Sequence, residues 1–176
     1  MFKKIFTKKT KIYLRDSSFI ITCPARSGST MLVHYLRSNP GICAHGEALA
    51  QGDVHDICSH YGAKICLPDA RKDDAIKQLT NLKNRDPALF IYKILFDAAG
   101  HEIAGFKIKF DELCLSQYEA VKNVVVNDID IKIIFLTREN LLRRYISFYL
   151  AKHVTGITMV TDSSQAPKKL KKISLD

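Results

Sequence analysis

Residues 18–32 read SFIITCPARSGSTML, and this stretch decides the fold of the chain. Residues 18–23 form a short apolar run that ends at Pro24, which is typical of a buried β-strand. Residues 29–38 follow with apolar side chains at helical spacing, and Pro40 lies just beyond them. A buried strand, a glycine-containing turn and a helix in immediate succession predict the first unit of a parallel sheet covered by helices.

The remaining chain repeats this alternation of strand and helix. Short apolar runs predict further strands, and the stretches between them predict helices. A chain of 176 residues suits one globular domain. We therefore predict a single domain over residues 1–176 with a three-layer, P-loop-like α/β fold, in which helices flank a parallel sheet. The predicted strands are 42–44, 103–110 and 131–137, and the predicted helices are 69–84, 86–100, 116–127 and 139–152.

The turn between the first strand and the first helix has the chemistry of an anion site. Backbone N–H groups at a helix start lack internal partners, and the helix dipole adds partial positive charge. Gly28 lets the backbone approach a ligand closely, and Arg26 adds a permanent charge. Hydroxyl donors come from Ser27, Ser29 and Thr30. The turn therefore predicts a bound phosphate-like group, and a ligand-free Ser/Gly connection is the alternative.

Two familiar phosphate loops do not match this turn. A Walker A loop requires GxxxxGK[ST], and no Lys occurs between residues 12 and 63. Cys23 and Arg26 lie too close together for the CxxxxxR spacing of a tyrosine phosphatase. A nucleotide kinase or another P-loop phosphotransferase remains the rival enzyme class, but it would need the missing Lys.

A second strand-to-helix junction stands at residues 137–147, TRENLLRRYIS. Arg138 leaves the predicted strand end and Ser147 lies about two turns into the next helix, so both can reach one anion at the sheet edge. Arg143 lies four residues before Ser147, and with Arg144 it either adds charge or is solvated. The opposite stripe of this helix is predicted to pack into the core: Leu142, Tyr145, Ile146 and Tyr149.

Both junctions resemble motifs of one family. Residues 24–32, PARSGSTML, resemble the 5′-phosphosulfate loop of sulfotransferases, most closely the bacterial carbohydrate sulfotransferases of the nodulation-factor and trehalose type. Residues 137–147 look like the 3′-phosphate motif of the same family, an Arg at a strand end and a Ser nine residues on. Residues 105–113, GFKIKFDEL, also resemble a block of these enzymes.

The resemblance implies a co-substrate and a reaction. The donor would be 3′-phosphoadenosine 5′-phosphosulfate, and residues 26–30 would hold its 5′-phosphosulfate. Arg26 would steady charge on the leaving phosphate, while Arg138 and Ser147 would grip the 3′-phosphate. The sulfuryl group would pass to a hydroxyl of a carbohydrate or glycolipid acceptor, and fixed arginine charges would make a metal unnecessary.

Such a transfer needs a base to take the proton of the acceptor hydroxyl. The resemblance implies Glu47, because the carbohydrate enzymes use a Glu in a similar Gly-Glu context. His45 is the alternative, since its ordinary pKa suits neutral pH. A base elsewhere in the chain also stays open. Lys107 either faces the site or lies in solvent.

Charge and cysteine content indicate which partners the protein binds and in which cellular compartment it is found. The formal net charge is +9, but the excess lies in basic ends, residues 1–15 and 166–176, which are expected to be flexible. Between these ends acidic and basic residues balance, so we predict no specific nucleic-acid partner, only peripheral contact of the ends with an anionic surface. No apolar run is long enough to span a membrane. Five cysteines without a CxxC pattern predict reduced thiols and a cytoplasmic protein.

Two further expectations concern metal binding and the length of the domain. His55, Cys58 and His60 crowd together, but no second cluster supplies the remaining ligands, so no metal site is predicted. Family members are generally longer than this chain, so the domain is expected to lack a C-terminal portion that covers the donor. A truncated protein that binds the nucleotide without catalysis is the alternative from another functional class.

Overall fold

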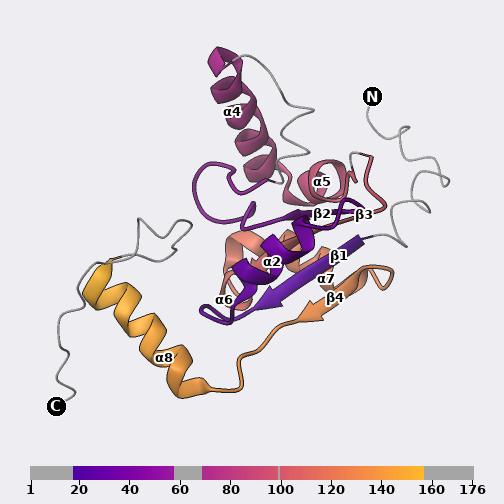
Figure 1. The fold of residues 1–176 in the computed structure, drawn as a ribbon. Helices are drawn as coiled ribbons and strands as arrows, with labels where there is room; N and C mark the ends of the chain where they lie inside the picture. Colours follow the sequence, from indigo (N-terminus) through magenta and orange to yellow (C-terminus); the bar gives the residue numbers. More distant parts are fainter. Residues whose placement is uncertain (1–17, 58–68, 99, 157–176) are drawn as a thin grey trace.

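The computed structural model describes residues 18–57, 69–98 and 100–156 of the chain. They form an α/β fold around a four-stranded sheet in the order β2-β3-β1-β4 (Figure 1). All three strand pairs are parallel, which confirms the predicted sheet. The strands are β1 Ser18–Cys23, β2 Ile42–His45, β3 Ile103–Lys109 and β4 Lys132–Phe135.

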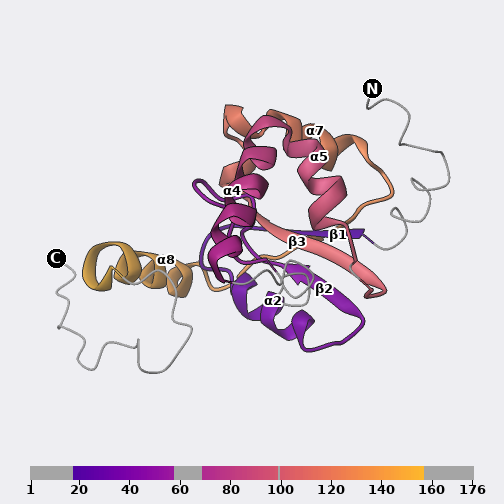
Figure 2. The ribbon, with the colours of Figure 1, turned by 90° about the horizontal axis from the view of Figure 1, so that it is seen from above.

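Helices cover both faces of the sheet, as the alternating pattern predicts. Figure 2 shows α2 on one side of the strands and both α5 and α7 on the other. The α-helices are α2 Ser29–Arg37, α4 Asp69–Arg85, α5 Pro87–Phe90, α6 Phe110–Leu113, α7 Glu119–Asn127 and α8 Leu141–Tyr149. Wider turns of π type extend two of them, Ile91–Leu95 after α5 and Leu150–Thr155 after α8, and a 3₁₀ turn, Ser116–Tyr118, precedes α7.

Strand β1 is the centre of the core because its side chains are buried on both faces. Phe19 and Ile21 pack with Val33 of α2 in one apolar cluster. Ile20 points to the other face and joins the larger cluster under α5 and α7. The neighbouring β3 approaches closely at Gly105, where any Cβ would collide with the backbone oxygen of Phe19. The apolar run of residues 18–23 is therefore the strand against which the helices on both faces of the sheet pack.

Several element boundaries differ from the predictions. The helix expected over 86–100 begins as predicted, since the Asp86 side chain caps α5 by accepting from Leu89 N at 2.9 Å. It ends earlier, at Leu95. The strand expected over 131–137 covers only 132–135, and all four of its residues are exposed.

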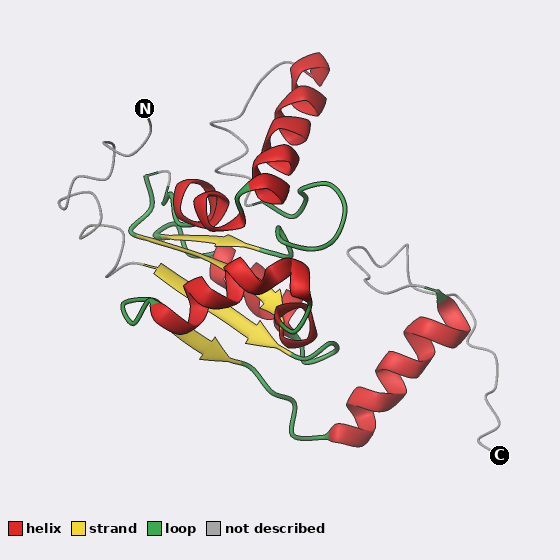
Figure 3. Cartoon of the chain, turned by 180° about the vertical axis from the view of Figure 1, so that it is seen from behind, coloured by secondary structure: helices red, strands yellow, loops and turns green. Residues whose placement is uncertain are grey.

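The predicted burial of the α8 stripe is wrong. Figure 3 shows α8 projecting away from the sheet at the end of a long connection after β4. Leu142 and Tyr145 are 68% and 60% exposed, and Ile146 is 40% exposed. An amphipathic sequence fixes which side chains share a helix face, but not whether another element covers that face.

The order of connections locates the best place for a ligand. From β1 the chain crosses over α2 to β2, and from β3 it returns through α7, on the opposite face, to β4 (Figure 2). Since β1 and β3 are neighbours, connections leave adjacent strand ends in opposite directions. In open parallel sheets ligands bind outside the carboxyl ends of strands at such a switch point. The turn at residues 24–28 follows β1 at this point, and Lys109 ends β3 beside it.

Candidate functional site

The turn after β1 combines two left-handed residues with the start of a helix. Arg26 has a φ of 64° and Gly28 a φ of 93°, and Gly28 is the N-cap residue of α2. A left-handed conformation is costly for arginine, and such strain is found mostly at functional sites. The first N–H groups of α2 have no intrahelical acceptors and lie at the positive end of the helix dipole. The turn therefore combines a strained backbone with the unpaired N–H groups of a helix start.

A hydrogen bond joins the two sequence motifs. Arg26 Nε donates to Ser147 Oγ at 3.0 Å, although the two residues are 121 positions apart. Ser147 belongs to α8, and Arg26 to the turn after β1. The contact brings the start of the first motif and the end of the second to one place beyond the sheet edge.

Hydroxyl groups of the turn differ in their partners. Ser27 Oγ is buried and has no hydrogen-bond partner among the described residues. A buried hydroxyl without a partner is costly, and a ligand oxygen at the turn would satisfy it. Thr30 Oγ1 accepts from Lys107 Nζ at 3.2 Å. Thr30 therefore connects the turn to β3.

A carboxylate between two lysines lies next to the turn. Glu47 Oε1 accepts from Lys107 Nζ at 2.7 Å, and Glu47 Oε2 lies 2.7 Å from Lys109 Nζ. The Lys107 side chain is only 2% exposed, and that of Glu47 is 24% exposed. In the β1–β3 register Lys107 lies opposite Ile21, which packs against the α2 side of the sheet. Strand alternation therefore puts both lysines on the same side as Thr30.

Charges in this cluster set the ionisation of Glu47. Burial by itself would raise the pKa of Glu47, but hydrogen bonds and charges from Lys107 and Lys109 outweigh it and lower the pKa below its ordinary value. Burial would also lower the pKa of Lys109, yet Glu47 and Glu112 raise it overall. Glu47 is therefore an ionised carboxylate at neutral pH and can accept a proton.

Backbone contacts fix the position of Glu47. Asp56 accepts from Gly46 N through its backbone oxygen at 2.7 Å and from Glu47 N through Oδ2 at 3.3 Å. Arg37 Nη2 binds Asp56 Oδ1 at 2.8 Å, and Arg37 Nε donates to the carbonyl of Ala44 at 2.7 Å. Asp56 itself has a φ of 54°, a second left-handed residue of non-glycine type near the site. The Arg37–Asp56 pair thus holds the segment that carries Glu47.

His45, the other candidate base, lies on the opposite side of the sheet. It is fully buried, and its Nε2 lies 3.6 Å from Cys43 Sγ. Cys43 packs with Ala104, whereas Ala44 between them packs with the α2 cluster. Alternation along β2 therefore turns His45 away from Glu47 and its lysines.

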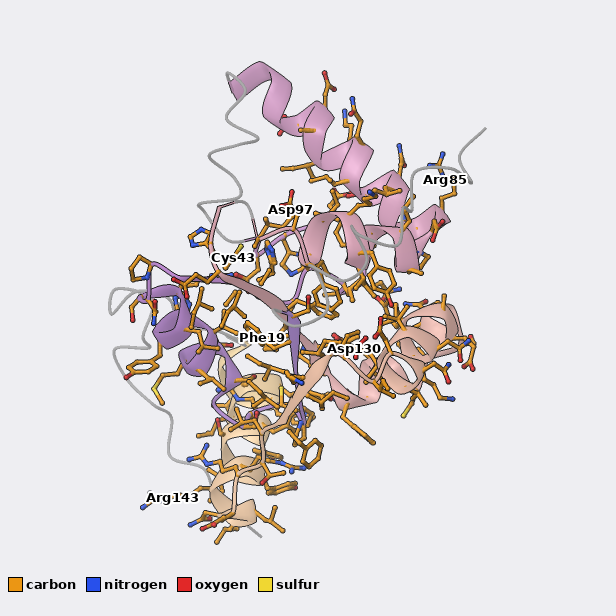
Figure 4. All side chains as sticks on the ribbon, turned by 90° about the vertical axis from the view of Figure 1, so that its right-hand side faces the viewer. Phe19, Cys43, Arg85, Asp97, Asp130 and Arg143 are labelled. Carbon is orange, nitrogen blue, oxygen red and sulfur yellow. The ribbon has the colours of Figure 1, made fainter. Side chains whose placement is uncertain are left out.

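Arg138 is half-buried in the connection after β4. Arg143 is exposed on α8, and Figure 4 shows it at the periphery, whereas Phe19 lies in the interior. Arg144 is half-buried on the same helix. Arg138 thus lies nine residues before Ser147, in the connection that leads into α8, and Arg143 is exposed to solvent.

Sequence reasoning missed part of the cluster around Glu47. It left Lys107 open and did not single out Lys109, Asp56 or Arg37. The signal for the lysines was the alternation of β3, in which two cations interrupt an otherwise buried strand two residues apart. Nothing in the local sequence indicates that Asp56 and Arg37 support Glu47, because they meet only through the fold.

The described residues contain neither a metal-type cluster nor a membrane-spanning helix. In that part of the chain no group of three or more His, Cys, Asp or Glu side chains is arranged to hold a metal ion. Cys58 and His60 of the crowded His/Cys segment lie outside the described residues, as do both basic ends. None of the helices in the described ranges is long and apolar enough to cross a membrane.

The site thus has a turn at the N-terminus of α2, a second motif hydrogen-bonded to that turn, and an ionised carboxylate held by two lysines. These features come from three separate segments that meet at the switch point of the sheet. Comparisons with known proteins give no family model, no curated protein and no solved structure that matches the chain. The case for a function therefore rests on the residues and geometry of this site.

Proposed function

We propose that the protein is a sulfotransferase that moves a sulfuryl group from 3′-phosphoadenosine 5′-phosphosulfate to a hydroxyl, that of a carbohydrate or glycolipid. The observation that carries the proposal is the 3.0 Å bond from Arg26 to Ser147. It links the segment that resembles a 5′-phosphosulfate loop with the segment that resembles a 3′-phosphate motif. Only a donor with phosphate groups at both ends of its ribose needs both segments at once.

The donor would bind across the carboxyl end of β1. Its 5′-phosphosulfate would face the N-terminus of α2, with Arg26 and the Ser27 hydroxyl as additional donors. Arg138 and Ser147 would bind the 3′-phosphate. Lys107, already bonded to Thr30, would add positive charge beside the transferred group.

Transfer would follow an in-line displacement in which position and electrostatics supply most of the catalysis. The acceptor oxygen forms a bond to sulfur while the bond from sulfur to the 5′-phosphate oxygen breaks. Glu47 takes the acceptor proton, and 3′-phosphoadenosine 5′-phosphate leaves. Glu47 is favoured over His45 as the base because it lies beside Lys107 and Thr30, whereas His45 is buried on the other side.

A P-loop phosphotransferase is the second candidate, and one contact favours it. Lys107 reaches Thr30 from β3 and could serve as the cation that the turn itself lacks. The two candidates differ in nucleotide, since a phosphotransferase would prefer ATP with Mg²⁺ over a 3′-phosphorylated nucleotide. We further infer a cytoplasmic location, because Cys23 and Cys43 are buried as thiols.

Calorimetric titration tests the proposal with three nucleotides: 3′-phosphoadenosine 5′-phosphate, ADP, and ATP with Mg²⁺. We expect the 3′-phosphorylated nucleotide to bind tightest. Arg138→Ala should weaken it by about ten- to hundredfold, because a charge-assisted contact is lost, and should leave ADP unchanged. Arg143→Ala is the matched control on exposed α8 and should change neither affinity. Tighter binding of ATP with Mg²⁺ would favour the phosphotransferase instead.

A product assay separates an enzyme from a non-catalytic binding protein. The assay follows transfer of radiolabelled sulfate from the donor to a panel of saccharides and glycolipids. A labelled product supports the proposed enzyme. A protein that binds the nucleotide but labels no acceptor would instead be a nucleotide-binding module.

A further inference from the structure

A cavity of about 370 Å³ lies outside the candidate donor site. Its volume falls within the range of ligand pockets in proteins. Most of its lining side chains are polar, and they include Gln51, Asp53, Lys83, Asn84, Gln117 and Tyr118.

The cavity opens at the same edge of the sheet as the donor site. Residues 51–53 follow the carboxyl end of β2 by a short segment, and residues 117–118 follow β3 and the short α6. Pro87 starts α5, which leads back to the beginning of β3. All three segments therefore meet at the carboxyl ends of the strands, on the side that α5 and α7 cover (Figure 2).

A tight turn connects the cavity to the candidate base. Ala50 N donates to the carbonyl of Glu47 at 2.9 Å, and Gln51 comes next in the chain. Such a turn keeps its end Cα atoms within about 7 Å, and one more residue adds about 3.8 Å. The Cα of Gln51, on the cavity wall, thus lies within about 11 Å of the Cα of Glu47.

Buried hydrogen bonds hold this wall in place. Lys83 is 4% exposed, and its Nζ donates to the carbonyls of Ala50 at 2.8 Å and Gly52 at 2.6 Å. The Tyr118 hydroxyl donates to the carbonyl of Leu49. Burial lowers the pKa of Lys83, which Asp53 partly opposes. The ammonium group of Lys83 therefore binds the backbone of the cavity wall.

The groups that can meet a ligand are neutral amides and one carboxylate, and the Gln117 side chain also hydrogen-bonds the Tyr118 side chain. Gln51, Asn84 and Gln117 are exposed at the cavity, and each amide both donates and accepts hydrogen bonds. Asp53 adds an acceptor and disfavours an anionic ligand there. Side chains that both donate and accept hydrogen bonds match a ligand with several hydroxyl groups better than an aryl or aliphatic one.

We propose that this cavity binds the non-reacting part of the acceptor, a neutral polyhydroxylated unit at least one ring away from the hydroxyl that reaches Glu47. The inference rests on the proposed function and adds a size requirement to it. The base lies on the α2 side of the sheet and the cavity on the side of α5 and α7, so an acceptor that occupies both has to pass around the carboxyl ends of the strands. An oligosaccharide is long enough to do so, and a monosaccharide fills only one of the two. Acceptors of two or more rings are therefore preferred over their monomers.

Side-chain amide signals in ¹⁵N-resolved NMR spectra test the cavity directly. The probes are maltotriose, cellotriose and chitotriose with glucose and N-acetylglucosamine as their monomers. We expect at least one trisaccharide to shift the side-chain amides of Asn84 and Gln117, with at least tenfold weaker binding of its monomer. Asn84→Ala should weaken that trisaccharide about five- to tenfold, as expected for loss of hydrogen bonds to a neutral ligand.

Gln78→Ala is the control, since Gln78 is an exposed amide on the same helix, α4, and does not line the cavity. It should leave the affinity within twofold. If saturating saccharides leave the Asn84 and Gln117 amides unmoved, or if both variants weaken binding equally, the cavity assignment is wrong. Binding of 3′-phosphoadenosine 5′-phosphate to the wild-type protein is measured separately. If the nucleotide does not bind, the proposed reaction is wrong, and the amide shifts still show whether the cavity binds a saccharide.

Discussion

The two strand-to-helix junctions of the candidate donor site differ in how well the strand and helix on either side of them pack against the rest of the molecule. The first follows β1, whose six residues are all buried, and leads into α2, which packs on the sheet. The second follows β4, whose four residues are all exposed, and leads into α8, which projects away (Figure 1). Arg26 and Ser147 join these two regions by one hydrogen bond.

This difference separates two tasks. The packed region, β1 with β3 and α2, also holds the groups proposed for chemistry, Glu47 and Lys107. The outlying region, β4 with α8, holds those proposed to recognise the 3′-phosphate. Substitutions in the packed region should therefore change stability or turnover, and substitutions in the outlying region should change recognition at little cost in stability.

The largest expected effect comes from Gly105→Ala in the packed region. The added Cβ would collide with the backbone oxygen and ring of Phe19, so β1 and β3 would have to separate. We expect destabilisation of more than about 4 kcal/mol, or failure to fold, measured by urea denaturation.

Gly28→Ala is the control for Gly105→Ala, because its Cβ would meet no atom within 4 Å and only the left-handed backbone is unfavourable. Its cost should be about 1–2 kcal/mol. Equal costs for the two variants would mean that the close approach of β1 and β3 does not limit stability.

Glu47→Gln should break the proposed chemistry. Loss of the base is expected to reduce turnover about 10²- to 10⁴-fold, while affinity for 3′-phosphoadenosine 5′-phosphate stays nearly intact. Glu112→Gln is the comparison, since Glu112 contacts Lys109 but does not contact Lys107 in the described part of the chain. Turnover of Glu47→Gln close to wild type would remove Glu47 from the mechanism.

The packed region was largely predictable from sequence. Its strand, turn and helix follow one another within residues 18–37, so local propensity and burial point the same way. The outlying region was predictable only in part. The alternation that predicts β4 and the apolar stripe of α8 describe which side chains share a face, and the structure leaves those faces exposed.

The candidate site shows the same limit. Arg26, Gly28 and Thr30 could be named because their motif is contiguous. The pairing of Glu47 with Lys107 joins residues 60 positions apart, and the choice between Glu47 and His45 depends on which side of the sheet each faces. Such facts come from register and strand direction, which a single sequence does not fix.

A matched pair of leucines tests the two regions by packing. Leu95, at the end of the turn that extends α5, is fully buried in one apolar cluster with Ile20 of β1, and Leu142 on α8 is 68% exposed. Leu95→Ala should cost about 2–5 kcal/mol and Leu142→Ala less than about 0.5 kcal/mol, measured by urea denaturation. A large cost for Leu142→Ala would mean that the α8 stripe is buried in solution, and the contrast between the regions would fail.

The smallest expected effect is a pH dependence in the packed region. Lys107 and Lys109 lower the pKa of Glu47 despite its burial, so the carboxylate stabilises the fold above its ordinary pKa of about 4.3, and this contribution is lost as the pH falls below that value. The stability advantage of wild type over Glu47→Gln should therefore be present at pH 6 and shrink towards pH 3. Its size should be on the order of 1 kcal/mol, since Glu47 is partly exposed and solvent screens the pair.

Glu119→Gln gives the matched exposed pair for the pH experiment. Glu119 lies 3.6 Å from Lys122 on α7, and both side chains are more than half exposed. An exposed pair contributes little to stability, so the difference between wild type and Glu119→Gln should stay near zero from pH 6 to pH 3. If the stability difference between wild type and Glu47→Gln is equally independent of pH, the two lysines do not stabilise the Glu47 carboxylate. The ion pairs of the packed region would then contribute no more to stability than an exposed pair does.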